Sequence, residues 1–286
     1  MGILYLVATP IGNLEDITLR GLRILEQVAL IAAEDTRTTR KLLGSYGIAT
    51  PITSYHEHTS RTKAAGLLKM LATSDIALVS EAGTPGISDP GRLLVQMALD
   101  TGFQVVPVPG ASAPASALSI SGFPSDQYLF LGFLPRRKAD RTKQLASVAG
   151  VPFTLVAFES PHRLRASLND LLAVLGDREV AVSREMTKRH EELFTGRLSG
   201  AVDHFSQPRG EFTLVIAGAP SGTGAGSTTV PSDVPDKEAL REEILKLQES
   251  GVGAKEAAAT IAGSSNLSRR EAYRMWLDVI SEERQS

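Results

Sequence analysis

The chain has 286 residues, a formal net charge of −2, and 42% hydrophobic residues. It can therefore bury a normal core, and its charge excludes an overall basic field for nucleic acid, so basic residues would have to act locally. Cysteine is absent, which excludes disulfides, thiolate metal ligands and cysteine nucleophiles and suits a reducing compartment.

The first 122 residues alternate apolar segments typical of strands with helical patterns. Strands are expected at 4–8, 30–33, 76–80 and 104–108, and helices at 17–27, 38–46, 61–72, 92–100 and 111–121. This alternation predicts a mostly parallel sheet covered by helices. We therefore expect an N-terminal α/β domain over residues 1–122.

After residue 122 strands dominate. They are expected at 128–134, 153–158, 179–184, 193–198 and 212–217, with helices at 137–149 and 162–175. This predicts a second α/β domain with more antiparallel pairing, over residues 123–218.

The composition changes again near residue 219. Small, polar residues predict a flexible linker at 219–236, and amphipathic patterns predict a helical appendage at 237–286. Ser268 and Glu271 form a capping box for a last helix. Two of these helices have the spacing of a helix-turn-helix, but a small stabilising bundle is the favoured interpretation.

Residues 80–91, with the sequence SEAGTPGISDPG, are the most informative stretch. Glycines permit positive φ and prolines stiffen the loop. It follows a buried strand, at the sheet edge where open α/β proteins bind ligands. A mere connection is the alternative, but the usual length is about 2–6 residues. Special turns at 9–13, 34–37 and 108–112 fall at the same edge, so the sequence predicts a cleft there.

Common cofactor and targeting motifs are absent from the sequence. There is no GxGxxG, no GxxxxGK[ST] and no HExxH, so we expect neither an ordinary dinucleotide site, nor ATP hydrolysis, nor a metal. No apolar run approaches the ~18–20 residues of a membrane span. The N-terminus lacks the basic region of a signal peptide, and we expect a cytoplasmic protein.

Residues 136–143 carry five positive charges and one negative charge. They form either a solvated helix face, which is the usual case, or a patch that contacts phosphates. A second polar cluster follows a strand at 184–192, where its mixed charge suits either substrate positioning or surface ion pairs.

Eight segments, in order, resemble one known family: LYLVATPIGNLEDIT at 4–18, AEDTRTTRKLL at 33–43, VSEAGTPGISDPG at 79–91, VPGASA at 108–113, GFLPR at 132–136, ESPHRL at 159–164, RE-T-K at 184–188 and GEFTLVIAG at 210–218. The family is the ribosomal RNA small-subunit 2'-O-methyltransferase I family, within the tetrapyrrole (class III) methylase superfamily. The resemblance implies two α/β domains with S-adenosylmethionine in the cleft between them. It also implies a homodimer without a metal that methylates the ribose 2'-hydroxyl of a cytidine in the decoding centre of 16S rRNA.

The resemblance also implies which residues contact the cofactor: Pro10, Ile11, Glu81, Gly83, Thr84, Pro85, Gly86, Ile87, Ser88, Ala111, Ser112, Phe158, Arg184, Thr213 and Leu214. A general base would assist attack by the hydroxyl. Its candidates are Glu81, Asp89, Glu185 and a Lys188 with a lowered pKa, and the spacing selects none of them. Catalysis by positioning alone is the alternative.

Local basic residues are the predicted RNA contacts: Arg136, Arg137, Lys138, Arg141, Arg163, Lys188 and Arg189. Two other functions stay open at this point. One is a methyltransferase of the same fold that acts on a tetrapyrrole, and the other is a non-catalytic RNA-binding assembly factor.

Overall fold

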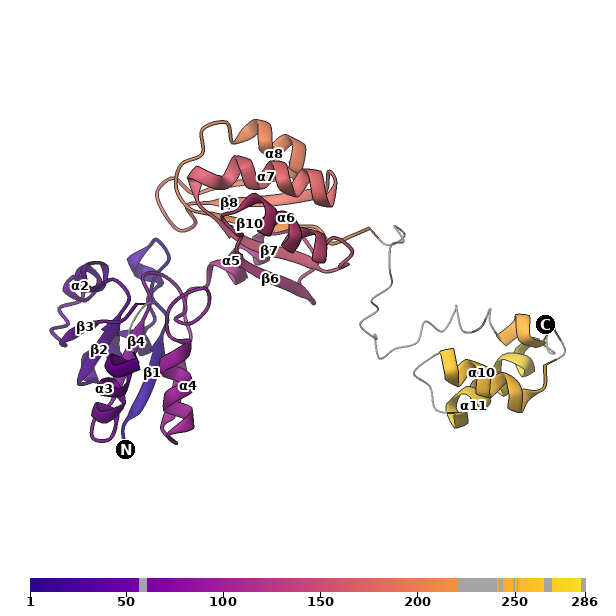
Figure 1. The fold of residues 1–286 in the computed structure, drawn as a ribbon, viewed down its shortest axis with the longest axis horizontal. Helices are drawn as coiled ribbons and strands as arrows, with labels where there is room; N and C mark the ends of the chain where they lie inside the picture. The colour runs from indigo at the N-terminus through magenta and orange to yellow at the C-terminus, as the bar shows by residue number, and fades with distance from the viewer. Residues whose placement is uncertain are drawn as a thin grey trace. The chain divides into compact units, whose positions relative to one another are not determined.

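The structure, a computed structural model, describes residues 1–56, 61–220, 241, 244–248, 250, 252–264 and 269–283. Contacts between residues divide the chain into two compact units, Met1–Thr223 and Gly224–Ser286, and Figure 1 draws the second unit in yellow. The two units are described separately below.

The first sheet is parallel throughout, with the strand order β3-β2-β4-β1-β5 in the described residues. Its strands are β1 (Ile3–Val7), β2 (Leu30–Ala33), β3 (Ile52–Ser54), β4 (Ile76–Val79) and β5 (Gln104–Val108). Every residue of β4 is buried, as expected for a strand covered on both faces. The predicted parallel sheet is confirmed, and β3 is a strand that the sequence did not predict.

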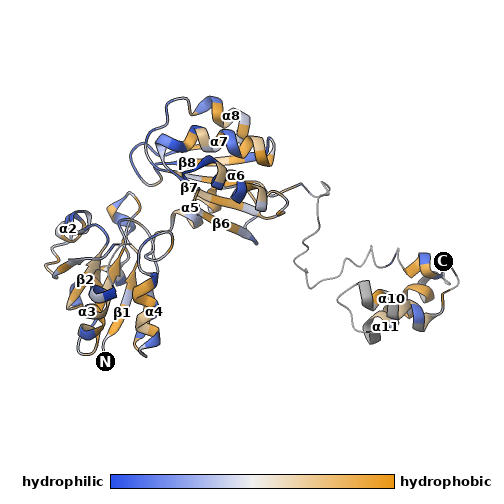
Figure 2. Ribbon diagram, viewed as in Figure 1, coloured by the Kyte–Doolittle hydropathy of each residue, from blue (hydrophilic) through white to orange (hydrophobic). Residues whose placement is uncertain are grey.

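Helices cover both faces of this sheet: α1 (Leu19–Gln27), α2 (Thr36–Ser45), α3 (Arg61–Leu71) and α4 (Arg92–Asp100). Successive strand residues point to opposite faces. Ala77 and Val79 pack with α1 and α2, whereas Ile76 and Leu78 pack with α3 and α4. In Figure 2 the strands β1 and β2 are accordingly mostly hydrophobic.

The second sheet has the order β6-β7-β10-β8-β9 in the described residues, and only the β6–β7 pair is parallel. Its strands are β6 (Tyr128–Phe133), β7 (Thr154–Glu159), β8 (Glu179–Arg184), β9 (Glu192–Arg197) and β10 (Phe212–Ile216). The predicted shift towards antiparallel pairing is confirmed. The sequence-based prediction ended the fourth of these strands at residue 198, but Leu198 instead begins a helix.

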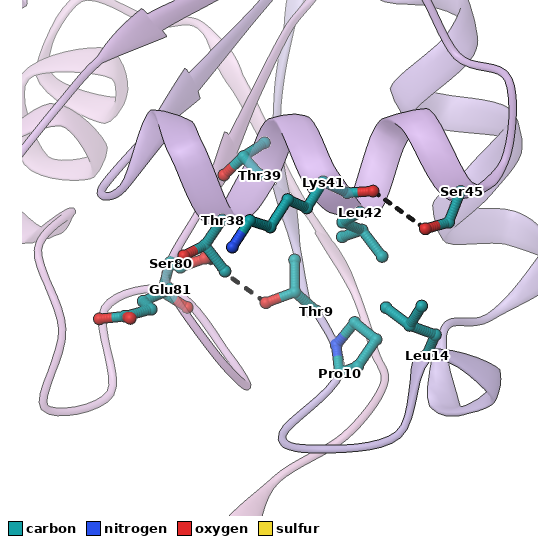
Figure 3. Close-up of a pocket in the computed structure, with 10 residues that line it drawn as sticks. All are labelled: Thr9, Pro10, Leu14, Thr38, Thr39, Lys41, Leu42, Ser45, Ser80 and Glu81. Atoms are coloured by element: carbon teal, nitrogen blue, oxygen red, sulfur yellow. Dashed lines mark hydrogen bonds between the residues drawn. The ribbon is translucent and has the colours of Figure 1, made fainter.

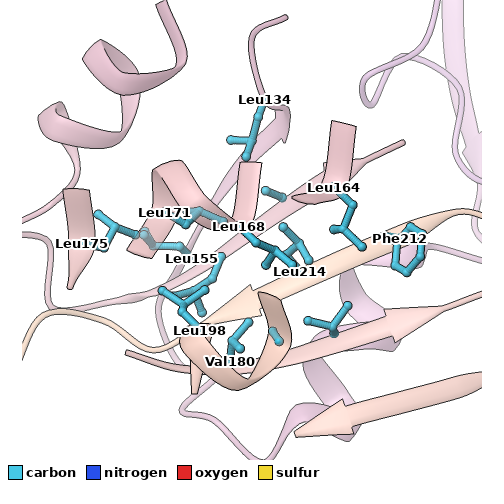
Figure 4. Packing of buried hydrophobic residues seen from close by; sticks show 14 of the residues in the cluster. Leu134, Leu155, Leu164, Leu168, Leu171, Leu175, Val180, Leu198, Phe212 and Leu214 are labelled. Atoms are coloured by element: carbon cyan, nitrogen blue, oxygen red, sulfur yellow. The ribbon is translucent and has the colours of Figure 1, made fainter. Parts of the chain in front are cut away.

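One face of this sheet carries α6 (Lys138–Ser147), α7 (Pro161–Leu175) and α8 (Leu198–His204). Figure 4 shows Leu164, Leu168 and Leu171 of α7 beside Leu155 and Leu214 of the sheet. These α7 leucines recur every three or four residues, which places them on one face of the helix.

Helix α5 (Ala113–Ser121) follows β5 of the first sheet but packs on the second one (Figure 1). Ala117 and Leu118 contact a cluster that includes Val156 and Val215. Ile11, from the turn after β1, packs against the same cluster. The two sheets of the first unit therefore share buried apolar contacts.

The second unit contains α10 (Ala254–Ser264), α11 (Arg269–Glu283) and a helical segment at 244–248. Ile244, Ile261 and Trp276 are buried together in its small core. The predicted linker at 219–236, apart from its first two residues, and Ser268 of the predicted capping box lie outside the described residues. The domain limits predicted from the sequence stay predictions. In the described part of the chain, the helices are too short or too polar to cross a membrane.

Candidate functional site

A cleft of about 520 Å³ lies between the two sheets of the first unit. The loop at 80–91 and the start of α5 line it on the side of the first sheet, and the ends of β6, β7 and β10 line it on the other. Its volume falls within the range of about 300–1,000 Å³ that is usual for small-molecule sites. We refer to it below as the cleft.

The loop at 80–91 is held in one conformation by its own hydrogen bonds. Thr9 and Gly83 exchange two backbone hydrogen bonds of 2.9 Å each, which fix the loop to the turn after β1. The buried Ser80 hydroxyl donates to the carbonyls of Ala82 and Gly83, both at 3.3 Å. Gly91 has a φ of 145°, and a Cβ at this position would lie 2.9 Å from the Leu78 side chain. Only glycine meets both demands.

Three carboxylates, those of Glu34, Glu81 and Asp89, gather at the cleft. None of them forms an ion pair within the described residues, and no lysine or arginine of these residues lines the cleft. Burial, reinforced by Glu34 and Glu81 and opposed by a hydrogen bond with Ser80, raises the pKa of Asp89 to about 6. Burial and the neighbouring Asp35 and Glu34 likewise raise the pKa of Glu81. The cleft therefore favours a ligand that carries positive charge.

Two other carboxylates that line the cleft already have partners. The buried Glu159 pairs with Arg163 at 2.6 Å and accepts a hydrogen bond of 2.5 Å from the Ser167 hydroxyl. Glu211 pairs with Lys188 at 2.7 Å. These two residues hold the cleft wall together, and the uncompensated charge belongs to the other three carboxylates.

Aromatic side chains form the apolar part of the cleft. The rings of Phe133 and Phe158 have their centroids 5.3 Å apart, and Phe133 is 55% exposed. Ile87, on the opposite loop, is 49% exposed. Apolar surface of this kind suits a flat heteroaromatic ring. A cleft with such walls and an anionic region fits S-adenosylmethionine, which combines an adenine ring with a sulfonium.

Lys188 joins the loop after β8 to the cleft wall. Its ammonium donates to Glu185 at 3.0 Å and to Glu211 at 2.7 Å. Burial acts to lower the pKa of Lys188, but these two carboxylates raise it above its usual value. Burial acts to raise the pKa of Glu185, but hydrogen bonds from Glu211 and Lys188 lower it. The expected lowered pKa of Lys188 is therefore wrong, and neither residue has the pKa of a useful base.

Nine of the fifteen predicted cofactor residues line the cleft: Ile11, Glu81, Gly83, Thr84, Ile87, Ser88, Ser112, Phe158 and Thr213. The candidate base Asp89 lines it too. Phe133, Glu34 and Glu159 were missed, although all three stand in segments that the sequence analysis had already singled out.

The other six predicted residues do not line the cleft. Leu214 points into the core on the opposite face of its sheet, because neighbouring strand residues alternate. Arg184 is engaged by Glu192 at 2.7 Å and by the Arg209 carbonyl at 2.7 Å. Pro85 and Gly86 belong to the loop without lining the cleft. The Ala111 carbonyl accepts a hydrogen bond from the Thr84 hydroxyl. Pro10 lines a separate hollow.

The predicted RNA contacts separate into exposed and internal residues. Arg136, Arg137, Lys138 and Arg189 are exposed. Arg141 is only 4% exposed and donates two hydrogen bonds to Asp170, at 2.8 and 2.5 Å. Arg163 pairs with the buried Glu159. We therefore remove Arg141 and Arg163 from the predicted RNA surface, because their guanidinium groups hold the second sheet's helices and loops in place.

A family model described as tetrapyrrole (corrin/porphyrin) methylases matches residues 3–201. The chain belongs to the tetrapyrrole methylase family. Within this family it is similar to proteins named ribosomal RNA small subunit methyltransferase I. The Synechocystis sp. relative is 45% identical over 98% of this chain and 99% of its own length. The Bacillus subtilis relative is 42% identical over 96% and 93%.

A Thermotoga maritima relative with the same name is 48% identical over 221 residues, which are 76% of this chain and 99% of that protein. Nearly all of that relative thus matches about three quarters of this tetrapyrrole methylase. The matched length, 221 residues, is close to the length of the first unit of this chain, Met1–Thr223.

Solved structures of the tetrapyrrole methylase family share this fold. Uroporphyrin-III C-methyltransferase from Thermus thermophilus, complexed with S-adenosyl homocysteine, has a TM-score of 0.53 and 22% identity over 76% of this chain and 97% of its own. The methyltransferase CobJ has a TM-score of 0.58 and 16% identity over 77% and 95%. The predicted fold class is confirmed. The chain is a methyltransferase, and S-adenosylmethionine is its methyl donor.

Proposed function

We propose that this methyltransferase methylates the ribose 2'-hydroxyl of a cytidine in the decoding centre of 16S rRNA. The observation that carries the proposal is the similarity to ribosomal RNA small subunit methyltransferase I along nearly the whole chain. The structural neighbours, uroporphyrin-III C-methyltransferase among them, are at most 22% identical to this chain and support the fold alone. Among the described residues, no feature of the cleft specifically favours a tetrapyrrole. Because the chain belongs to a methyltransferase family, a function as a non-catalytic assembly factor is no longer needed as an alternative.

The proposed cofactor contacts are those predicted residues that line the cleft. S-adenosylmethionine supplies an electrophilic methyl group on a positively charged sulfur when it is bound. Ile87, Phe133 and Phe158 would exclude water from the adenine side. Glu34, Glu81 and Asp89 would face the positive charge, since no lysine or arginine among the described residues opposes them there.

Glu81 is the proposed general base. Its raised pKa makes it a stronger proton acceptor than an ordinary carboxylate. Its side chain is exposed, whereas Asp89 is partly buried beside Ser80. The Glu81 carboxylate would accept the hydroxyl proton as the ribose oxygen becomes methylated. Asp89 would then serve mainly to hold the negative potential of the cleft.

We also propose that the protein works in the cytoplasm as a homodimer. Three exposed apolar side chains support a contact along the edge strand β6 and α5: Ile120 (46% exposed), Tyr128 (45%) and Leu129 (36%). Exposed apolar side chains beside an open strand edge are typical of interaction surfaces. The proposed reaction uses no metal. Among the described residues, no three His, Cys, Asp or Glu side chains are placed so that together they could hold a metal ion.

Mass mapping of ribose methylation tests this function. Small ribosomal subunits from cells that lack the protein should gain one ribose methyl group when incubated with the pure protein and S-adenosylmethionine. Glu81→Gln should slow this transfer far more than it weakens cofactor binding, because Glu34 and Asp89 would still face the positive charge. If the wild-type protein adds no methyl group to ribosomal RNA, or methylates a base instead, the proposed function is wrong.

A further inference from the structure

A second hollow, of about 290 Å³, lies between α2 and the turn after β1. Figure 3 shows Thr9, Pro10 and Leu14 on one side and Thr38, Lys41 and Leu42 on the other. A more open hollow adjoins it and shares Thr38, Lys41 and Glu81 with it, while adding Arg37 and Arg40. We call these two hollows together the α2 groove. None of the predicted functional residues except Pro10 and Glu81 lines it.

The α2 groove combines an apolar floor with a basic rim. Pro10, Leu14 and Leu42 provide the floor, and Leu14 is 46% exposed. Arg40 and Lys41 are exposed on the rim, and their side chains have no hydrogen-bond or ion-pair partner within the described residues. Figure 3 shows the Lys41 side chain extending along the hollow towards Thr38 and Ser80. A nucleotide would suit both parts of the groove. Its flat base would lie on the apolar floor, and its phosphate would bind the cations of the rim.

The amides at the start of α2 do not contribute an anion site. The Asp35 carboxylate already accepts hydrogen bonds from the amides of Arg37 and Thr38, at 2.7 and 3.3 Å. Asp35 also pairs with the Arg37 guanidinium at 3.2 Å. Recognition of a phosphate at this groove therefore depends on Arg40 and Lys41.

The walls of the groove are fixed relative to each other. The 3₁₀ turn η1 (Leu14–Asp16) carries Leu14, and the Tyr46 hydroxyl at the end of α2 donates a 2.6 Å hydrogen bond to the Leu14 carbonyl. On the same turn, the Asn13 side chain accepts a hydrogen bond from the Glu15 amide at 3.1 Å. A preformed groove loses less entropy when it binds a flexible strand.

Glu81 connects the groove to the cleft, since it lines both. We infer that the α2 groove binds the nucleotide of the RNA substrate that neighbours the methylated one, with its base against Pro10 and Leu14 and its phosphate on Arg40 and Lys41. This inference rests on the proposed function. It places the ribose of the methylated nucleotide beside Glu81, which is the proposed general base and lines both the groove and the cleft.

Charge-removing variants of the full chain test the groove. Arg40→Gln and Lys41→Gln are compared with Lys69→Gln, which removes the same charge from the exposed end of α3. The end of α3 precedes the start of β4, whereas Glu81 follows the end of β4. Lys69 therefore lies near the opposite edge of the sheet from Glu81. Affinity for a 16S rRNA fragment is measured by fluorescence anisotropy over a salt series, and S-adenosylmethionine affinity by calorimetry.

The double variant Arg40→Gln/Lys41→Gln should weaken RNA binding about tenfold and reduce the salt slope by about 1–2. Cofactor affinity should stay unchanged, and Lys69→Gln should bind RNA like the wild type. If the double variant and Lys69→Gln have the same RNA affinity and salt slope, the groove does not bind the RNA.

A steric pair tests the apolar floor. Ser45 lines the hollow, and among the described residues its hydroxyl bonds only to the Lys41 carbonyl of its own helix (Figure 3). Ser45→Phe should fill the hollow and raise the KM for RNA several-fold, whereas Ser45→Ala should not. If the wild type binds RNA but methylates no ribose, the proposed function is wrong. The RNA affinities of the variants still show in that case whether the groove binds RNA. Absence of RNA binding by the wild type would overturn both.

Discussion

The Tyr46 hydroxyl donates a 2.6 Å hydrogen bond to the Leu14 carbonyl, across 32 residues of sequence. It fixes the end of α2 to the turn that carries Leu14. Tyr46→Phe removes only this bond, so it should lower the free energy of unfolding by about 0.5–1.5 kcal/mol and raise the KM for RNA without changing cofactor affinity. Tyr5→Phe is the control, because the hydroxyl of Tyr5 has no partner in the described residues and Tyr5 lines neither the groove nor the cleft. Equal KM values for the two variants would contradict the role of the bond.

Gly83 and Gly86 should respond differently to the same substitution. Both have positive φ, 77° and 82°, so valine at either position should cost about 1–3 kcal/mol of stability. Only Gly83 lines the cleft, where a Cβ would lie 3.5 Å from the Ile11 side chain, whereas nothing lies within 4 Å of a Cβ at Gly86. Calorimetry should therefore find cofactor affinity reduced at least tenfold in Gly83→Val and little changed in Gly86→Val. If Gly83→Val bound the cofactor as tightly as the wild type, the loop would be only a connection.

Asp89 should make stability depend on pH. Its pKa is raised from 3.8 in the unfolded chain to about 6 in the folded protein, so the folded state binds the proton more tightly. Stability therefore falls as the pH rises from about 4 to about 6, and the loss is complete above that range. Asp89→Asn avoids this loss and should be more stable than the wild type at pH 7.5, on the order of 1 kcal/mol. The two proteins should be equally stable near pH 3.5.

Urea unfolding at both pH values measures the effect of Asp89→Asn. Asp126→Asn, which changes an exposed carboxyl, should match the wild type at both. A stabilisation by Asp89→Asn that is the same at pH 3.5 and pH 7.5 would show that the carboxyl's ionisation is not its cause.

Arg141 should be essential for stability and dispensable as an RNA contact. Arg141→Ala removes both short hydrogen bonds of the buried Asp170 and leaves it only the exposed Lys138, 3.8 Å away, which should cost about 3–5 kcal/mol. Arg137→Ala, at an exposed position, should change stability by less than about 0.5 kcal/mol. Denaturant midpoints measure both. An Arg141→Ala variant as stable as Arg137→Ala would contradict this assignment.

The strands of the first sheet could be predicted because burial on both faces leaves nearly continuous apolar segments such as Ile76–Val79. The short strand β3 was missed because its three residues are only half-buried and two of them are polar. Helix α8 was missed because Arg197 and Leu198 continue a strand-like pattern. The helix is held there by packing against α7 and by Asp177, which accepts a 2.9 Å hydrogen bond from the Ser199 amide across 22 residues of sequence.

The site could be located but not resolved in detail. Loops after parallel strands had to meet at one edge, which was enough to find the cleft. The hydrogen bond from Lys188 to Glu211 could not be predicted, since Glu211 lies 23 residues away in the sequence. The buried position of Arg141 had a usable signal: Leu145 and Val148 follow it at helical spacing and are buried with it, so Arg141 stood on the apolar face of its helix.

The cleft includes Ile11 near the start of the chain and Thr213 on β10, the strand at the centre of the second sheet. During synthesis, the proposed site for the methyl donor therefore stays incomplete until more than two hundred residues have left the ribosome. A nascent chain released early would carry the whole first sheet and still lack one wall of that proposed site, which would tie the onset of activity to translation of the β10 segment.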